Sequence, residues 1–119
     1  MPKVSKLTYK SAGDGISTSN ASWSFSGEVA LNFDEHVSKS VPFYNTGHDL
    51  ICRVSDFFLQ NGSVCYELGC STGALIEKLA VHNSTKEMRF VGVEVEPDMV
   101  SMARNRFKTK ENLQVDEVD

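Results

Sequence analysis

A strand–turn–helix junction at residues 64–82 constrains the fold of this chain more than any other feature. Residues 64–68 form a short apolar run typical of a buried strand, residues 69–73 form a turn with a glycine at each end, and residues 74–82 have a helical pattern. In an open α/β sheet such a junction lies at the carboxyl end of a strand, where ligands usually bind. The glycines allow close approach of a ligand, and the helix start offers free amides to a polar or anionic group. The junction therefore predicts a small-molecule site.

The segments around the junction predict an α/β chain. Apolar residues at helical spacing predict helices at 28–39, 48–59 and about 97–108, while β-branched residues predict a second strand at 89–95 and a third from Leu113. Alternation of strand and helix is the opening of a doubly wound parallel sheet. We therefore expect the N-terminal half of a Rossmann-like sheet, with three strands and preceding N-terminal helices.

The sequence also predicts which faces of two of these elements are apolar. The nearly continuous apolar character of residues 63–68 predicts a strand that is buried on both faces. In the 48–59 helix, a broad apolar face is expected from Leu50, Ile51, Val54, Phe57 and Phe58. Pro42 should separate this helix from the preceding one, because proline disfavours helix at the residue before it.

The ends of the chain suggest its domain organisation. Residues 1–24 are rich in serine, glycine, asparagine and threonine and are expected to form a flexible tail, followed by one partial domain at 25–119. The N-terminus lacks the apolar core of a secretory signal, which favours a cytoplasmic location. No apolar run approaches the roughly 18–20 residues that span a membrane, so no membrane association is expected.

Charge and reactive side chains narrow the function classes. A net charge of −4 gives no general attraction for nucleic acid. A local basic strip is interpreted as a solvated helix face: Arg104, Arg106, Lys108 and Lys110. Three cysteines without metal-like pairing indicate reduced thiols: Cys52, Cys65 and Cys70. A nucleophilic Cys70 is disfavoured because no histidine can be assigned beside it, and the scattered histidines predict no metal site.

Glu94, at the carboxyl end of the second strand, is the second candidate for ligand binding. An acidic residue there can accept hydrogen bonds from ribose hydroxyls, although it could equally be a solvated strand-end carboxylate. Gly69 and Gly73 give the spacing G-x-x-x-G, which is neither the dinucleotide fingerprint nor a phosphate loop. The combination suits a nucleoside ligand that carries an amino-acid tail.

These motifs resemble a known superfamily. The segments ELGCSTG at 67–73 and VGVEVEPDM at 91–99 look like motifs I and II of class I S-adenosylmethionine-dependent methyltransferases. Upstream, FDEHV at 33–37 and SVPFY at 40–44 are similar to the carboxy-S-adenosylmethionine synthase branch, which carboxylates the cofactor with prephenate for tRNA wobble-uridine modification. The resemblance covers roughly residues 25–108. The branch usually has Asp and Asn where this chain has Glu94 and Val95.

The resemblance implies S-adenosyl-L-methionine as cofactor and a set of cofactor-binding residues: Tyr44, Glu67, Gly69, Cys70, Ser71, Gly73, Glu94, Val95 and Asp119. The loop would contact the methionine end, and Tyr44 would close over it, unless Tyr44 is simply an aromatic packed on the sheet edge. Glu94 would hold the ribose and Val95 would lie against the adenine. Asp119 would meet the adenine amino group, unless it belongs to an unstructured terminus.

The resemblance also predicts an incomplete fold. Members of the superfamily have seven strands, whereas this sequence reaches the third, so the first strand would keep an unpaired edge. We expect the chain either to dimerise through that edge or to be part of a longer or split protein. The predicted function is an S-adenosylmethionine-binding, methyltransferase-like protein that performs methyl transfer or forms the carboxylated cofactor. The alternative is a non-catalytic binding or regulatory fragment, and the glycine spacing disfavours a nicotinamide oxidoreductase. No catalytic residue is assigned.

Overall fold

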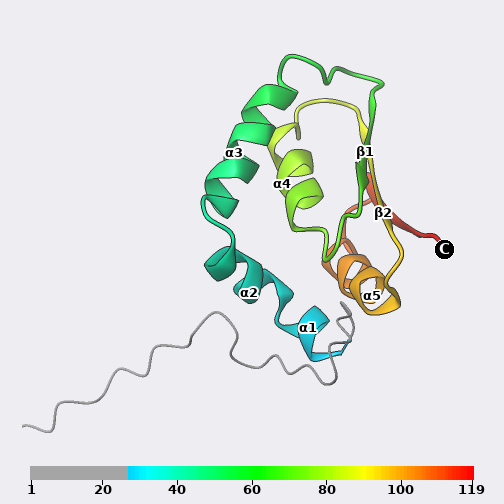
Figure 1. Cartoon of the computed structure of the whole chain (residues 1–119). Helices are drawn as coiled ribbons and strands as arrows, with labels where there is room; N and C mark the ends of the chain where they lie inside the picture. Colours follow the sequence, from blue (N-terminus) through cyan, green and yellow to red (C-terminus); the bar gives the residue numbers. More distant parts are fainter. Residues whose placement is uncertain (1–26) are drawn as a thin grey trace, which may run out of the picture.

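The computed structural model describes residues 27–119, which form a three-stranded sheet and five helices. The helices are α1 (Glu28–Leu31), α2 (Phe33–Ser40), α3 (Tyr44–Ser55), α4 (Ala74–His82) and α5 (Pro97–Arg106). The strands are β1 (Val64–Leu68), β2 (Arg89–Glu94) and β3 (Leu113–Glu117) (Figure 1). The predicted flexible tail at 1–24 lies outside the described residues. None of the helices within 27–119 is long and apolar enough to cross a membrane.

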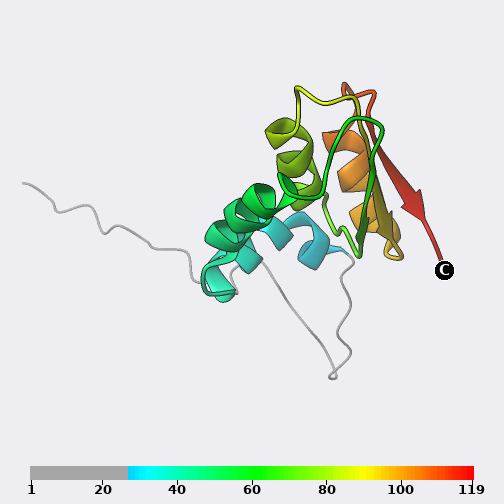
Figure 2. The ribbon, with the colours of Figure 1, turned by 90° about the horizontal axis from the view of Figure 1, so that it is seen from above.

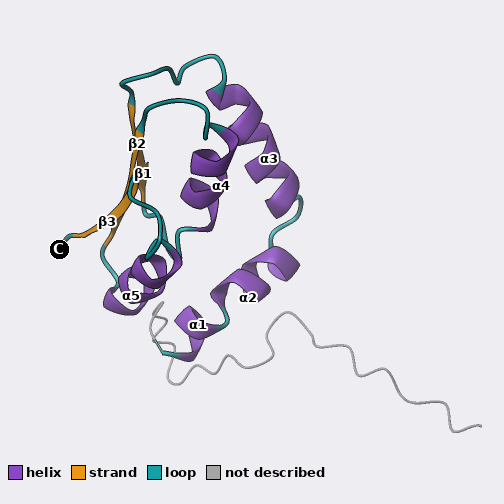
Figure 3. Ribbon diagram, turned by 180° about the vertical axis from the view of Figure 1, so that it is seen from behind, coloured by secondary structure: helices purple, strands orange, loops and turns teal. Residues whose placement is uncertain are grey.

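The sheet is parallel and has the order β1-β2-β3. In its register Tyr66 lies beside Val91, Phe90 beside Leu113, and Glu94 beside Glu117. All three strands therefore end at the same edge of the sheet, and the loops that follow β1 and β2 meet there (Figure 3). The α/β class and the three parallel strands agree with the sequence prediction.

The hydrophobic core fills one face of the sheet. Phe90, Leu113 and Val115 point to this face and pack against apolar residues of α4 and α5, including Ile76 and Ala103, which are both fully buried. The helices lie together on one side of the sheet when the molecule is seen from above (Figure 2). The opposite face therefore has no helical cover from the described residues.

The expectation that β1 is buried on both faces is wrong. Val64, Tyr66 and Leu68 are 41%, 63% and 80% exposed, whereas the alternate residues Cys65 and Glu67 are partly buried beneath the helices. The reason is positional: β1 is the edge strand, and its outward side chains lie on the face without helices. Within residues 27–119, an apolar residue in β1 is therefore not necessarily a buried one.

Helix α3 begins and ends four residues earlier than the sequence pattern predicted. Pro42 interrupts the helices as expected, and Phe43 has a left-handed φ of 59°, so the chain turns sharply and enters α3 at Tyr44. The predicted apolar face of α3 is exposed, with Phe57 at 86% and Phe58 at 75%, just after the last helical turn.

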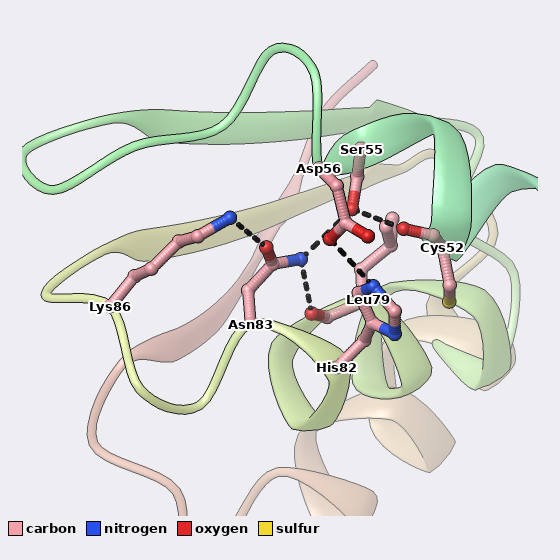
Figure 4. A network of polar contacts seen from close by, with 7 residues as sticks. All are labelled: Cys52, Ser55, Asp56, Leu79, His82, Asn83 and Lys86. Atoms are coloured by element: carbon pink, nitrogen blue, oxygen red, sulfur yellow. Dashed lines mark hydrogen bonds and ion pairs between the residues drawn. The ribbon is translucent and has the colours of Figure 1, made fainter.

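The inner face of α3 is instead polar and packs on α4. Buried Asn83 donates to the Ser55 hydroxyl at 3.0 Å and to the Leu79 carbonyl at 2.9 Å, while Ser55 donates to the Cys52 carbonyl at 2.6 Å (Figure 4). The ammonium group of Lys86 donates to the side-chain oxygen of Asn83, Oδ1, at 2.8 Å. Since buried amides are costly to leave unpaired, this network fixes how α3 and α4 meet.

Candidate functional site

The loop between β1 and α4 is held against β2 by backbone hydrogen bonds. The amides of Gly69 and Cys70 both donate to the Val93 carbonyl, at 2.7 and 3.0 Å. The amide of Gly73 donates back to the Cys70 carbonyl at 2.8 Å and closes the turn. Gly73 has a φ of +81°, and a Cβ there would lie 2.4 Å from the Phe107 ring. A side chain at this position would be strained by the backbone and would collide with the ring of Phe107, which directly follows α5, so the turn requires glycine.

Glu94 ties this loop to the end of β2. One of its carboxylate oxygens accepts the Ser71 amide at 2.7 Å, and the other accepts the amides of Val95 at 2.9 Å and Glu96 at 3.1 Å. The side chain is 8% exposed, so the alternative interpretation of a solvated carboxylate is wrong. Glu94 lies beside the loop, and its carboxylate already accepts hydrogen bonds from three backbone amides.

A hollow of about 190 Å³ opens beside the loop. Five of the predicted site residues line it: Tyr44, Glu67, Gly69, Cys70 and Ser71. Five further residues line the hollow and were not predicted from the sequence: Phe33, His48, Thr72, Ala74 and Leu75. One signal could have found His48, since it follows Tyr44 by one helical turn and so shares its face of α3.

Glu67 places an unsatisfied polar group at the hollow. The Ile76 amide hydrogen-bonds to its carboxylate, yet the Oε2 atom is buried and has no partner within residues 27–119. Burial raises the pKa of Glu67 to about 7, the Glu94 carboxylate adds to the rise, and the Ile76 amide opposes it. A carboxyl group poised in this way can accept a hydrogen bond from a cationic ligand group and become fully ionised on binding.

The neighbouring hydroxyl and thiol both stay protonated at neutral pH. Burial raises the pKa of Tyr44, and the carboxylates of Asp34 and Glu67 add to the effect against the opposing charge of Arg106. Burial also raises the pKa of Cys70 to about 12, with Glu67 and Glu94 contributing. His48 lines the same hollow as Cys70, although no histidine was expected beside it. Since the thiolate is the reactive form, the raised pKa still leaves Cys70 unsuited to act as a nucleophile.

Asp34 of α2 connects the N-terminal helices to the loop. One carboxylate oxygen accepts the Thr72 hydroxyl, and the other pairs with the Arg106 guanidinium of α5. Thr72 is almost fully buried, at 1% exposed. Arg106 was expected on a solvated helix face. The structure instead places it in this ion pair, with 26% of its side chain exposed.

The other predicted site residues do not line the hollow. Gly73 closes the turn, and Val95 follows β2 with 60% of its surface exposed. Asp119 is exposed two residues beyond the end of β3, at the sheet edge where Glu94 lies beside Glu117. Pockets for drug-sized ligands are about 300–1,000 Å³. The hollow therefore suits one end of a nucleoside-sized ligand, and the other end would extend along the edge past Glu94.

A larger open groove lies between α3 and α4 and has a volume of about 530 Å³. Its wall mixes both signs of charge and contains none of the loop residues: Asp49, Cys52, Arg53, Glu77, Lys78, Val81 and His82. The smaller hollow is therefore the better candidate, because it joins a strand end, a helix start and an unpartnered buried oxygen.

Comparison with curated proteins identifies carboxy-S-adenosyl-L-methionine synthases among the relatives of this chain. The sequence is 39% identical over 83 residues to carboxy-S-adenosyl-L-methionine synthase of Campylobacter lari, a match that covers 69% of this chain and 34% of the relative. It is 32% identical over 100 residues to the enzyme of the same name from Sulfurimonas denitrificans, with 80% and 40% covered. The chain thus spans well under half the length of these relatives. No protein-family model matches the sequence.

Solved structures give the same picture at the level of the fold. The N-methyltransferase NodS from Bradyrhizobium japonicum, in complex with S-adenosyl-L-homocysteine, superimposes with a TM-score of 0.58 and 25% identity over 76% of this chain and 43% of that one. An RNA methyltransferase from Salinibacter ruber, bound to the same compound, gives a TM-score of 0.53 and 27% identity over 66% and 50%. These matches confirm the predicted half of a Rossmann-like α/β sheet.

Proposed function

The chain corresponds to the N-terminal portion of the class I S-adenosylmethionine-dependent methyltransferase fold, and we propose that it binds S-adenosylmethionine at the β1–α4 loop. The observation that carries the proposal is the hollow at the carboxyl end of β1, into which Tyr44 and Glu67 bring polar groups. The Glu67 Oε2 atom is a buried acceptor without a partner in the described part of the chain. It suits an ammonium group such as that of the methionine end.

The remaining contacts follow the position of each residue around the hollow. The backbone of Gly69, Cys70 and Ser71 would lie along the methionine end, with Tyr44 across from it on α3. The adenosine end would extend past Glu94 and Val95 toward Asp119. Since Glu94 already accepts three amides, a ribose hydroxyl would share an oxygen with a backbone donor. Gly73 would act through the shape of the turn.

The reaction depends more on how the cofactor is held than on activation by the protein. S-adenosylmethionine supplies an activated sulfonium, so the protein contributes mainly binding and alignment. Methyl transfer, or formation of the carboxylated cofactor as in the branch of the named relatives, would use parts that correspond to the rest of those relatives. Three free thiols within the described residues fit a cytoplasmic location.

A second candidate function is a binding or regulatory fragment without catalysis. The exposed edge strand β1 favours this candidate, because its apolar side chains offer a surface to a partner chain or to a second copy. A methyl-transfer assay of the 119-residue chain alone tests this second candidate. Activity in that assay would exclude the purely regulatory one.

Isothermal titration calorimetry tests the proposal. S-adenosylhomocysteine should bind to the chain and NADH should not. Glu67→Gln should weaken binding of S-adenosylhomocysteine, since a neutral amide forms no ion pair with an ammonium group and accepts a weaker hydrogen bond from it. Glu111→Gln is the matched control at an exposed carboxylate and should bind as the wild type does. Binding of NADH without binding of S-adenosylhomocysteine would overturn the proposal and favour an oxidoreductase.

A further inference from the structure

His48 is a buried histidine at the wall of the hollow. It lies on α3, is 7% exposed, and its ring centroid is 4.2 Å from that of Tyr44. It shares the hollow with Glu67. Its spacing to the other histidines is not that of a metal site, so its burial beside the proposed ligand site needs a different explanation.

Lys78 of α4 determines which ring nitrogen of His48 carries the proton. The Lys78 Nζ atom lies 3.1 Å from His48 Nδ1, and the same ammonium donates to the Asn45 side chain at 3.3 Å. An ammonium group can only donate, so Nδ1 must accept and the proton of the neutral ring sits on Nε2. Burial lowers the pKa of His48, and Lys78 lowers it further against the weaker opposing effects of Asp49 and Asp34. The ring is therefore neutral at neutral pH.

The Nε2–H group is a donor without an acceptor in the described part of the chain. Within residues 27–119 the hydrogen bond of His48 to a side chain is the one from Lys78 to Nδ1. Among the described residues, Glu67 Oε2 is the one buried side-chain nitrogen or oxygen atom that has no hydrogen-bond partner. Nε2 of His48 is therefore not such an enclosed atom. Nε2 is therefore neither bonded nor enclosed in this part of the chain, and His48 lines the hollow together with Glu67. The lining of the hollow thus includes a residue with an unused donor and a residue with an unused acceptor.

We infer that His48 is a specificity-determining residue, whose Nε2–H donates to the carboxylate of an α-amino-acid group while Glu67 receives the ammonium of that group. Lys78 is then a positioning residue that acts through His48 by holding Nδ1. The inference rests on the proposed function, which supplies a ligand with an amino-acid tail. It adds the residue that selects the tail.

Two ligands that differ only in the tail test the inference. S-adenosylhomocysteine carries the α-amino-acid group, whereas 5′-methylthioadenosine is the corresponding nucleoside thioether without it. His48→Leu should weaken binding of S-adenosylhomocysteine by about tenfold or more, since the hydrogen bond it loses is made to a charged group. Binding of methylthioadenosine should change by less than about twofold. His48→Gln keeps an N–H donor and should restore most of the lost affinity.

A matched control and a spectroscopic measurement complete the experiment. His82→Leu alters a histidine that pairs with Asp56 at 2.8 Å outside the hollow, and it should leave both affinities unchanged. Nitrogen-15 NMR of the imidazole should show the Nε2–H tautomer in the wild type and a mixture of tautomers in Lys78→Met.

The outcomes separate the inference from the proposed function. If neither ligand binds to the wild-type chain, both fail. If both ligands bind and His48→Leu weakens them equally, or weakens neither, the inference fails while the proposed function stands. An Nδ1–H tautomer in the wild type would also overturn the inference.

Discussion

Two glutamates near the carboxyl ends of β1 and β2 have different environments. Glu94 accepts three backbone amides and fixes the loop, whereas Glu67 keeps one buried oxygen without a partner in the described residues. A fully bonded carboxylate stabilises the fold, while an unsatisfied one costs stability until a ligand meets it. Glu67 is therefore the residue at which binding and stability oppose each other.

The first prediction is that Glu67→Gln stabilises the chain in a pH-dependent way. The folded-state pKa of Glu67 is raised from 4.5 to about 7, so across this window the folded chain binds more protons than the unfolded chain. Wild-type stability therefore falls as the pH rises through the window, by about 2 kcal/mol after a discount for partial exposure. The amide does not titrate and can still accept from Ile76.

Urea unfolding at pH 4.5, 6 and 8 measures this effect. The stability advantage of Glu67→Gln should be smallest at pH 4.5 and should grow to a plateau above pH 7. The exposed control Glu111→Gln should show no comparable trend. Parallel profiles for the wild type and Glu67→Gln would contradict the assigned pKa.

The second prediction concerns the close approach of Cys70 to β2. A Cβ at Gly92 would lie 2.5 Å from the Cys70 sulfur and 3.0 Å from its Cβ, so Gly92→Ala should destabilise the chain by about 1–3 kcal/mol. Cys70→Ala removes the nearer obstacle, and the double variant should recover part of the loss. Denaturant unfolding of the four proteins gives the coupling energy. Strictly additive effects would mean that the two positions do not compete for space.

Helices and strands were predictable to the extent that their signals are local. The β1–α4 junction, Pro97 at the start of α5 and the interruption at Pro42 all follow from backbone chemistry and appear where expected. Burial was less predictable, because the apolar residues of β1 and α3 depend on what lies beside them. Likewise the role of Arg106 depends on Asp34, which is far away in the sequence.

The third prediction tests whether Asp34 holds α2 against the loop. Asp34→Asn removes the charge that pairs with Arg106 and weakens the contact to Thr72. We expect faster hydrogen exchange in α2 and a loss of about 1 kcal/mol in stability, since the ion pair is partly exposed. Hydrogen-exchange mass spectrometry measures the first quantity and urea unfolding the second. Glu35→Gln alters a carboxylate that pairs with Lys39 within α2, and it should affect the loop less. Unchanged exchange in Asp34→Asn would show that other contacts hold α2.

At the scale of the whole molecule, the described residues leave apolar surface exposed on β1 and on α3. β1 bonds to β2 on one side, and within residues 27–119 no strand lies on its other side. Its outward residues are exposed, and so is the outer face of α3, which forms the end of the helix layer next to α4. An unpaired edge strand that carries exposed apolar side chains is a template for association.

The last prediction is that the 119-residue chain self-associates through β1. Analytical ultracentrifugation at micromolar concentration should detect dimers. Tyr66→Lys should shift the chain toward monomer, because it places a charge on the exposed face of the edge strand. Val81→Lys is the matched control, since Val81 is similarly exposed at 60% but lies on α4, and it should leave association unchanged. A well-folded wild-type monomer at tens of micromolar would contradict the prediction. Equal effects of the two lysines would instead place the contact away from the edge, because only Tyr66 lies on β1.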